Sequence, residues 1–234
     1  HNSIINNSIL NKINIYKIIH YHSEPFRVSL NITNIHKKLV INQYHCTLPE
    51  YKDCKIIRNF FNYNEDIIFN NKIKIGFYPS ITVSENKYYD KGFNETSNIF
   101  NKLSIKFPDV IFDIKTHMSY KDCINRKKDC HIIIDECKTG SFHKSTIEGL
   151  MLGTNVVVNI NKKIQDIHKK IYLRTLPITN TNLDNLEKSL IQLINKGKSQ
   201  LEKDAINSKK IFESYWNKDI VAKEYFDIYD SIIT

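Results

Sequence analysis

The chain has 234 residues, of which 41% are hydrophobic, 25% charged and 11% aromatic. This composition can close a hydrophobic core, and with only 6 Gly and 5 Pro it is not that of a disordered, collagen-like or low-complexity protein. The 34 basic residues exceed the 25 acidic ones, which gives a net charge of +9. That charge favours partners that carry phosphate, such as a nucleotide, a nucleic acid or an anionic membrane surface.

Charge alone does not choose among these partners. The basic residues are spread singly or in pairs, and pairs such as Lys127-Lys128 and Lys162-Lys163 are typical of solvated faces. The five cysteines form an odd set without a C-x-x-C pair, which argues against a disulfide framework and a zinc site. Apolar runs reach only strand length, so we expect no transmembrane segment and a cytoplasmic protein with reduced thiols.

The first part of the chain is predicted to hold short strands. The apolar stretches at residues 13–23 and 38–44 are rich in β-forming residues, and each ends in polar residues and His. Ile56-Ile57 is a further short strand, inside an Asn-rich region at 51–71 that has the composition of a linker. The sequence starts at His1, without an initial Met or the apolar region of a signal peptide, as expected for the cut end of a longer chain.

From residue 72 onward, strands and helices alternate. This alternation predicts βαβ crossovers and an α/β fold with an open, doubly wound parallel sheet, which binds ligands at the carboxyl ends of its strands. The tail is predicted to be helical, with Asn217 as the cap of a last helix. Strands are expected at 72–78, 110–114, 131–135 and 155–160, and helices at 92–103, 119–126, 144–152, 183–194 and 201–215; the last helix is expected to present Ile220, Val221, Tyr225, Ile228 and Tyr229 on one face.

The most informative stretch is 135–158. A strand ends at Asp135, a glycine-containing loop follows, and a helix begins near Lys144 or Ser145. The free amides at such a helix start can bind phosphate. Glu148 lies about one turn into this helix. There it either accepts two hydroxyl hydrogen bonds from a ribose or another sugar, or is a surface residue favoured by the helix dipole.

A second cluster of polar residues follows the strand at 72–78. Tyr78-Pro79-Ser80 comes directly after this strand, and Lys91-Gly92 precedes the next helix. Lys91 at a helix entrance is placed to meet a phosphate as a point charge, although an isolated Lys is more often solvent-exposed.

Taken in order, these motifs resemble those of the GT-B glycosyltransferases, especially family-4-like enzymes. FYPS, then KG, then IIIDECKTGSFHKSTIEGLMLGTNVVV resemble the donor-binding domain of that family. IIHYHSEP and KKLVINQYHCTLPEY resemble the end of its acceptor domain, and IIRNFFN resembles the entry to its interdomain linker. SYWNKDIVAKEYFDIYDSI resembles its closing helices, so the resemblance covers most of the chain from about Tyr16.

The resemblance implies a Rossmann-like, doubly wound parallel sheet of GT-B type, with a short or incomplete amino-terminal Rossmann-like part. The end of the acceptor-binding domain would occupy 1–58, the linker 59–71 and the nucleotide-sugar binding domain 72–215, and a closing helix at 216–234 would cross back to the first domain. The sequence departs from the family at Gly140, where an acid is usual eight residues before Glu148. Asp135 or Glu136 would replace that acid only if the loop folds back.

The resemblance also implies site residues. Ser80 and Lys91 would hold the diphosphate, His143 and the loop amides would contact phosphate or the transferred sugar, and Glu148 would bind ribose. His45 would contact the sugar or polarise the reacting centre, and His20 and His22 are weaker candidates. The implied catalytic residues are His45 and His143; the implied donor-binding residues are Ser80, Lys91, Gly92, Gly140, Ser141, Phe142, Lys144, Ser145 and Glu148.

The implied activity is transfer of a hexosyl or related group from a nucleoside diphosphate sugar to a glycan, a lipid-linked or a small-molecule acceptor. No D-x-D triad is present, so we expect no metal and no other cofactor, and the family favours retention of the anomeric configuration. Two alternatives stay open at this point. The same fold would act on nucleic acid, such as viral DNA bases, or the chain would be a non-catalytic remnant that binds a nucleotide.

Overall fold

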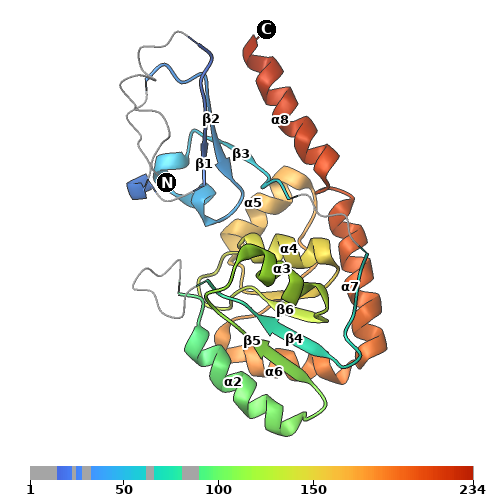
Figure 1. The fold of residues 1–234 in the computed structure, drawn as a ribbon. Coiled ribbons are helices and arrows are strands. Elements are labelled where there is room, and N and C mark those ends of the chain that lie inside the picture. The colour runs from blue at the N-terminus through green and yellow to red at the C-terminus, as the bar shows by residue number, and fades with distance from the viewer. Residues whose placement is uncertain (1–14, 23–24, 28–32, 62–65, 81–89, 234) are drawn as a thin grey trace. The chain divides into compact units, whose positions relative to one another are not determined.

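The computed structural model describes residues 15–22, 25–27, 33–61, 66–80 and 90–233. The chain forms two compact units. Unit 1 consists of His1–Phe60 together with Lys218–Thr234, and unit 2 of Phe61–Asn217. The first and last parts of the chain therefore share one unit, and the middle forms the other (Figure 1).

Unit 1 is a small parallel sheet with a helix on one face. Its strands lie in the order β1-β2-β3, and each is parallel to its neighbour. Leu39, Ile57 and Ile228 form one apolar cluster between sheet and helix, and Tyr51 belongs to a second cluster with Tyr21 and Val40. The elements are β1 (Ile18–Tyr21), β2 (Lys37–Ile41), β3 (Lys55–Ile57) and α8 (Lys218–Ile233), with single 3-10 turns at Pro25–Arg27, Tyr44–Thr47 and Pro49–Tyr51.

Two sequence expectations in unit 1 need correction. The strand predicted at 38–44 ends at Ile41, because the chain turns there into the 3-10 helix at Tyr44–Thr47. In α8, Val221 and Ile228 are buried as expected, whereas Tyr229 is 42% exposed and is not part of the buried face. Residues 13, 14 and 23 of the strand predicted at 13–23 lie outside the described part of the chain.

Unit 2 is the predicted doubly wound sheet. Its strands lie in the order β5-β4-β6-β7-β8, and every neighbouring pair is parallel. The strands are β4 (Lys74–Phe77), β5 (Ile111–Ile114), β6 (Ile132–Ile134), β7 (Asn155–Val158) and β8 (Thr179–Asn180). The helices are α2 (Phe93–Lys106), α3 (Tyr120–Lys128), α4 (Lys144–Leu152), α5 (Lys162–Tyr172), α6 (Leu183–Asn195) and α7 (Lys198–Glu213).

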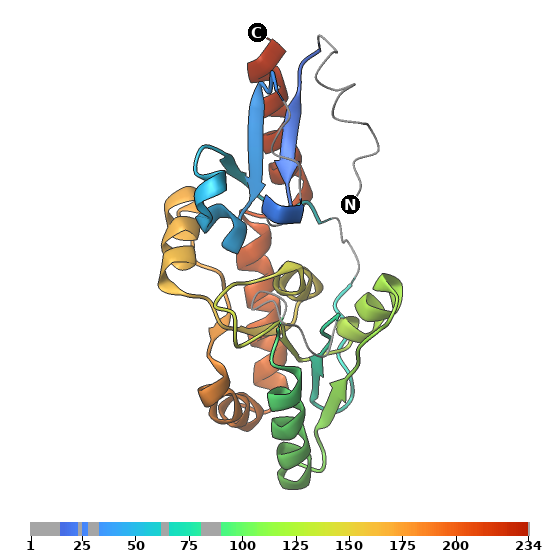
Figure 2. The same cartoon turned by 90° about the vertical axis from the view of Figure 1, so that its left-hand side faces the viewer.

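Helices cover both faces of this sheet. Ile75 and Phe77 point to a core shared with α2 and α6, while Ile133 of β6 packs toward α3 on the other side. The two views in Figures 1 and 2 show α2 and α6 together, on the opposite side of the sheet from α3 and α4. Helix α4 lies close to β7, because a Cβ added at Gly149 would come within 2.7 Å of the Val156 side chain.

The sequence did not predict α5 or β8. The signal for α5 was present, since Ile164, His168 and Tyr172 recur every fourth residue and are all buried. The Asn161 side chain caps this helix by accepting a hydrogen bond from the Ile164 amide. The pair Lys162-Lys163 is exposed, as its composition predicts, and it forms the first turn of α5.

Candidate functional site

The polar residues of unit 2 gather at the carboxyl ends of β4, β6 and β7. The strand register sets Phe77 beside Ile134, and Ile134 beside Val157, so the segments that follow these strands leave from one edge of the sheet. Asp135 and Glu136 follow β6 directly and are 1% and 0% exposed. This edge is where an open α/β sheet binds its ligand.

Asp135 is the centre of the cluster. Its Oδ2 accepts hydrogen bonds from the His143 amide at 2.7 Å and from the Thr146 hydroxyl at 2.8 Å, and its Oδ1 lies 2.8 Å from Lys91 Nζ. Burial acts to raise the pKa of Asp135, but the charges of Lys91 and His143 outweigh it. The pKa of this carboxyl is therefore held below its ordinary value.

Glu136 shows that the loop after β6 folds back on its own acid. Its carboxylate accepts hydrogen bonds from the amides of Lys138, Thr139 and Ser141 and from the Thr139 hydroxyl. Burial raises the pKa of Glu136 despite these bonds. The loop encloses the Glu136 carboxylate, so this carboxylate is not open to a ligand. The acid that is usual at the position of Gly140 would be open to one.

Gly140 makes this closed loop possible. Its φ of +80° is in the left-handed region that glycine adopts without strain, and its carbonyl accepts a hydrogen bond from the Asn161 amide at 2.8 Å. Ser141 and Phe142 are buried beneath the loop at 1% and 0% exposure. Three amides of this loop, those of Lys138, Thr139 and Ser141, donate to Glu136, and phosphate binding by the loop stays a prediction.

Lys91 is not a solvated side chain. Only 15% of its side chain is exposed, because its ammonium is drawn to Asp135. Gly92 follows as the residue before α2, and its amide donates to the Asp90 carboxylate at 3.0 Å. Ser80 lies at the exposed end of the segment after β4, immediately before residues that the structure does not describe. The structure thus brings Lys91 to the sheet edge beside β6.

The start of α4 combines three of the predicted residues. His143 occupies the position before the helix and is half-buried, but the capping carboxylate comes from Asp135. Lys144 is exposed, and its ammonium lies 4.3 Å from the centre of the Tyr120 ring. The amides of Lys144 and Ser145 are at the first two helical positions, which have no partner within a helix.

Glu148 is buried, so the interpretation of this residue as a solvated surface acid is wrong. It is 4% exposed, and its Oε2 lies 2.6 Å from Nζ of Lys127 on α3. Lys144 approaches the other oxygen, Oε1, at 3.8 Å. Burial, together with the charge of Glu148 and a hydrogen bond to it, raises the pKa of Tyr120.

Lys127 is the site residue that the sequence analysis missed. It was grouped with Lys128 as part of a solvated pair, yet it is 2% exposed. The amphipathic pattern of α3 contained a weak signal, because Lys127 falls three residues after the buried Ile124. A basic residue at a buried position of a helix needs a carboxylate partner, which only the fold supplies.

The predicted histidines of unit 1 lie in that unit's own core and strand ends. His45 is 4% exposed in the 3-10 helix after β2, and its ring stacks on Tyr44. His22 Nε2 and His20 Nδ1 are 2.9 Å apart, and burial, followed by the charge of His22, lowers the pKa of His20 to about 3. The roles assigned to His45 and His143 stay predictions.

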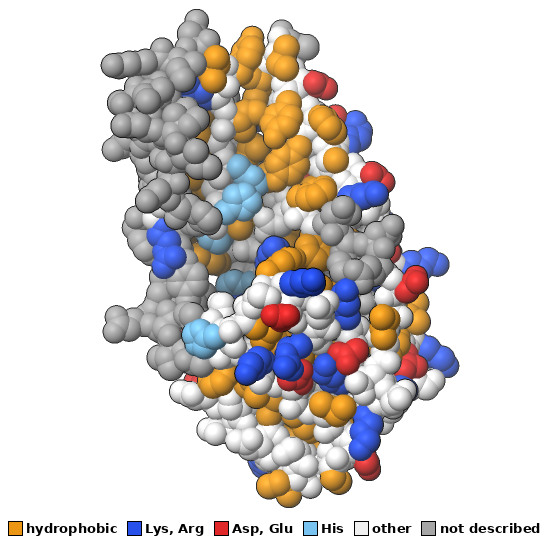
Figure 3. Space-filling model, in the orientation of Figure 1, with side chains coloured by type: hydrophobic (Ala, Val, Ile, Leu, Met, Phe, Trp, Pro, Cys, Tyr) orange, Lys and Arg blue, Asp and Glu red, His pale blue; other side chains and the backbone are white. Residues whose placement is uncertain are grey.

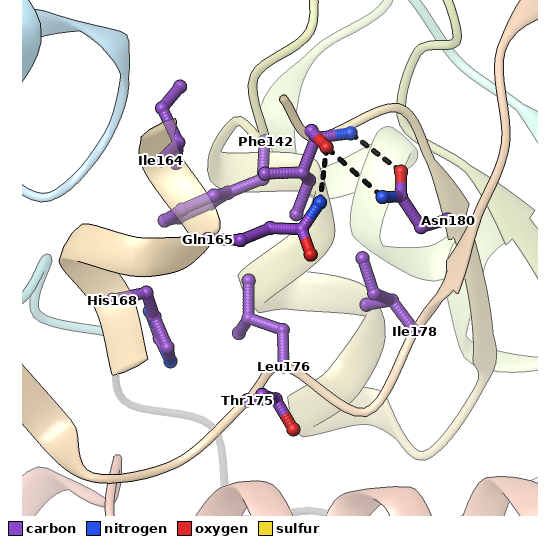
Figure 4. A pocket seen from close by; sticks show the side chains of 9 residues that line it. Phe142, Ile164, Gln165, His168, Thr175, Leu176, Ile178 and Asn180 are labelled. Carbon is purple, nitrogen blue, oxygen red and sulfur yellow. Dashed lines mark hydrogen bonds between the residues drawn. The ribbon is translucent and has the colours of Figure 1, made fainter. Parts of the chain in front are cut away.

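A cavity of about 170 Å³ lies behind the loop, on the α5 side of Phe142 (Figure 4). Two of its polar lining groups, Gln165 and Asn180, turn to the backbone of Ile160, whose carbonyl accepts hydrogen bonds from both side-chain amides. The remaining walls are mainly apolar, so the cavity differs in chemistry from the charged sheet edge.

Charge is mixed on the surface that Figure 3 shows. Lys and Arg side chains alternate there with Asp and Glu over the α/β unit, without a continuous basic stripe on this face. Among the described residues, no group of three or more His, Cys, Asp or Glu side chains is arranged to hold a metal ion. No helix in the described ranges is both long and apolar enough to cross a membrane.

Comparisons with known proteins agree with the fold. One solved structure is a mutant of TarM from S. aureus in complex with fondaparinux, α-GlcNAc-glycerol and UDP, with a TM-score of 0.61 and 12% identity over 83% of this chain and 44% of that one. HepE from Anabaena in complex with UDP-glucose gives a TM-score of 0.58 and 12% identity over 92% and 72% of the two chains. A glycosyltransferase from Rickettsia africae gives 0.51 and 13% identity over 97% and 79%.

These likenesses define the class of fold. The chain has the Rossmann-like fold of the GT-B glycosyltransferases, as the resemblance of its motifs implied. It spans less than half the length of the TarM chain. No protein-family model and no curated protein sequence matches the chain, and family 4 is not distinguished from other GT-B families.

Proposed function

We propose that the carboxyl edge of unit 2 binds a nucleoside diphosphate sugar and that the protein transfers the sugar to an acceptor. The observation that carries the proposal is the position of Lys91. Its ammonium stands at the ligand-binding edge of a GT-B fold, beside the start of α4. An ammonium has three donors and Asp135 takes one of them, so two remain for a diphosphate.

Electrostatics gives the mechanism of this proposal. Negative charge develops on the diphosphate as it leaves the sugar. Lys91 and the amides of Lys144 and Ser145 are the groups of this chain that would stabilise it. We propose that these groups suffice without a metal or another cofactor, so that a chelator leaves the transfer rate unchanged.

The donor and acceptor are proposed from the chemistry of the fold's relatives. Two of the structures above contain UDP or UDP-glucose, which makes a uridine diphosphate sugar the first donor to test. The TarM structure contains fondaparinux and α-GlcNAc-glycerol, which supports a glycan-type acceptor. His45 of unit 1 is the candidate for contact with the sugar. Retention of the anomeric configuration is proposed on the motif resemblance alone, and NMR of the product measures it.

A ligand screen with matched variants tests the proposal. Wild-type protein is screened by thermal shift against uridine, guanosine and adenosine diphosphate sugars, and the ligand that raises Tm is then titrated by calorimetry. Lys91→Met should weaken its binding by about tenfold to a hundredfold, through loss of a charge-assisted contact. Lys74→Met is the control, because Lys74 is also a buried, ion-paired Lys of unit 2 but lies at the amino end of β4.

Four outcomes matter. Loss of affinity in Lys91→Met but not in Lys74→Met supports the site. Equal affinities in both variants and the wild type remove Lys91 from it. No thermal shift with any nucleoside diphosphate sugar contradicts the proposed function, whereas binding without sugar transfer to glycan acceptors supports a nucleotide-binding protein without the activity.

A further inference from the structure

Lys127 occupies an environment unlike that of its neighbours on α3. Arg126 keeps 44% of its side chain exposed and Lys128 is half-buried, but Lys127 is 2% exposed. Its Nζ donates to Glu148 Oε2 and to Ser145 Oγ, each at 2.6 Å. Both partners belong to the first turns of α4, so one ammonium from α3 ties down the part of α4 that faces the sheet edge.

Stability does not explain this pair. The free energy needed to take the two charges out of water is about as large as the free energy that their attraction returns. An apolar pair of similar volume would therefore stabilise the fold as well. The geometry of Glu148 offers another explanation. Lys127 engages only Oε2, while Oε1 lies on the side of the exposed Lys144. Lys127 therefore holds the carboxylate by Oε2 from the buried side, while two exposed side chains approach the same carboxylate: Lys144 lies 3.8 Å from Oε1, and the Tyr120 hydroxyl makes a hydrogen bond to it.

We propose that Lys127 is a positioning residue for nucleotide recognition, which holds Glu148 so that its Oε1 accepts the ribose hydroxyls of the donor. The proposal rests on the proposed function and deepens it. A fixed acceptor discriminates by whether its hydrogen-bond partner is present. Lys127 thus makes the site selective for a ribonucleotide over a deoxyribonucleotide without touching the nucleotide itself.

The experiment compares two nucleotides on matched variants. Affinities for uridine diphosphate and its 2′-deoxy analogue are measured by calorimetry on the full chain. Wild-type protein should prefer uridine diphosphate by at least about tenfold, the worth of one hydrogen bond to a charged group. Lys127→Met should reduce this ratio to less than about threefold. Lys74→Met, which removes another buried, ion-paired lysine of unit 2, should keep the wild-type ratio.

A double variant separates positioning from direct contact. If Lys127 acts through Glu148, then Lys127→Met should change the affinity for uridine diphosphate by less than about threefold when introduced into Glu148→Gln. A further tenfold loss in that background contradicts the positioning role, because Lys127 would then contact the nucleotide. An unchanged ribose-to-deoxyribose ratio in the single variant Lys127→Met also overturns the proposal.

The design stays decisive if Lys127→Met does not fold. Lys127→Arg keeps the positive charge but moves the donor atoms, and it should lower the same ratio while the protein remains folded. A wild-type ratio in this variant overturns the proposal. If wild-type protein binds neither nucleotide, the uridine donor of the proposed function is wrong, and that result is distinct from a failure of the positioning role.

Discussion

Two groups of buried charges sit at opposite ends of β4 and β6 in unit 2, and they differ in depth. At the amino end of β4, Lys74 pairs with Asp129 and Asp113, whose side chains are 30% and 15% exposed. At the carboxyl end, Lys91 pairs with Asp135, whose side chain is 0% exposed, and Lys127 pairs with Glu148 at 5%. The deeper carboxylates are the more expensive ones to bury.

The difference indicates what each group does. The amino-end pair joins β4 to the turn before β6, where water still screens it, and a structural role is sufficient. The carboxyl-end acids instead hold backbone: Asp135 caps α4, and Glu136 binds three amides of the following loop. Asp135 and Glu136 fix the shape of the edge where a ligand would bind. Asp135 also holds Lys91, and Glu148 holds Lys127.

The largest expected effect is that of Asp135→Asn. The variant leaves Lys91 without its counter-charge and places an amide group among donors, so we expect a loss of about 3–5 kcal/mol in the free energy of unfolding. Asp129→Asn at the amino end is the matched control and should cost no more than about 1 kcal/mol, because its pair is partly exposed. Urea unfolding of both variants measures the difference. Equal losses would contradict the contrast between the two ends.

The pH dependence of stability sharpens the same comparison. The pKa of Asp135 is lower in the folded protein than in the unfolded chain, where it is about 3.9. Its contribution is therefore fully present above that value and is lost as the pH falls toward the folded pKa. We expect the stability gap between wild type and Asp135→Asn to be constant from pH 7 to about pH 5 and to shrink below about pH 4. A gap that does not change at acid pH would show that Asp135 is not ionised in the fold.

Glu148→Gln should affect both binding and stability. Donor affinity should fall by about tenfold to a hundredfold, since the amide replaces one acceptor by a donor. Because Glu148 is buried against Lys127, we expect a loss of about 1–3 kcal/mol in the free energy of unfolding, more than the roughly 0.5 kcal/mol typical of surface sites. Calorimetry and urea unfolding on one preparation test both, and unchanged affinity would remove Glu148 from the ribose site.

Gly149→Ala tests how closely α4 must approach the sheet. The added Cβ would meet the Val156 side chain at 2.7 Å and push α4 away from β7. We expect a loss of about 1–3 kcal/mol in stability, together with weaker donor binding, because α4 carries the site. A variant as stable as the wild type would show that α4 can shift without cost.

The smallest effect is expected from Asn161→Ala. The variant removes the cap of α5, which is worth about 1 kcal/mol. Since the Asn161 cap serves a helix outside the charged edge, donor affinity should stay within about twofold of the wild type. A large loss of affinity would extend the site toward α5 and the cavity behind Phe142.

The elements were largely predictable because each carries a local signal. The strands of unit 2 are short apolar runs, and α4 was predicted at its observed bounds, Lys144–Leu152, between a glycine-containing loop and Gly153. The partners in the site were not predictable, because they are set by contacts between distant elements. Only the weak spacing signal from Ile124 distinguishes Lys127 from Lys128, and the inward turn of Glu136 depends on how the loop closes over it.

Hydrogen exchange gives the most direct test of the central claim that the carboxyl edge of unit 2 is the donor site. Amide exchange of the full protein is followed with and without the nucleoside diphosphate sugar that stabilises it in the thermal-shift screen. We expect added protection at residues 138–148, which form the loop after β6 and the start of α4, and around Lys91. Exchange near Lys74 and Asp129 at the amino end should stay unchanged. Protection confined to the amino end, or binding without any change at residues 138–148, would contradict the claim.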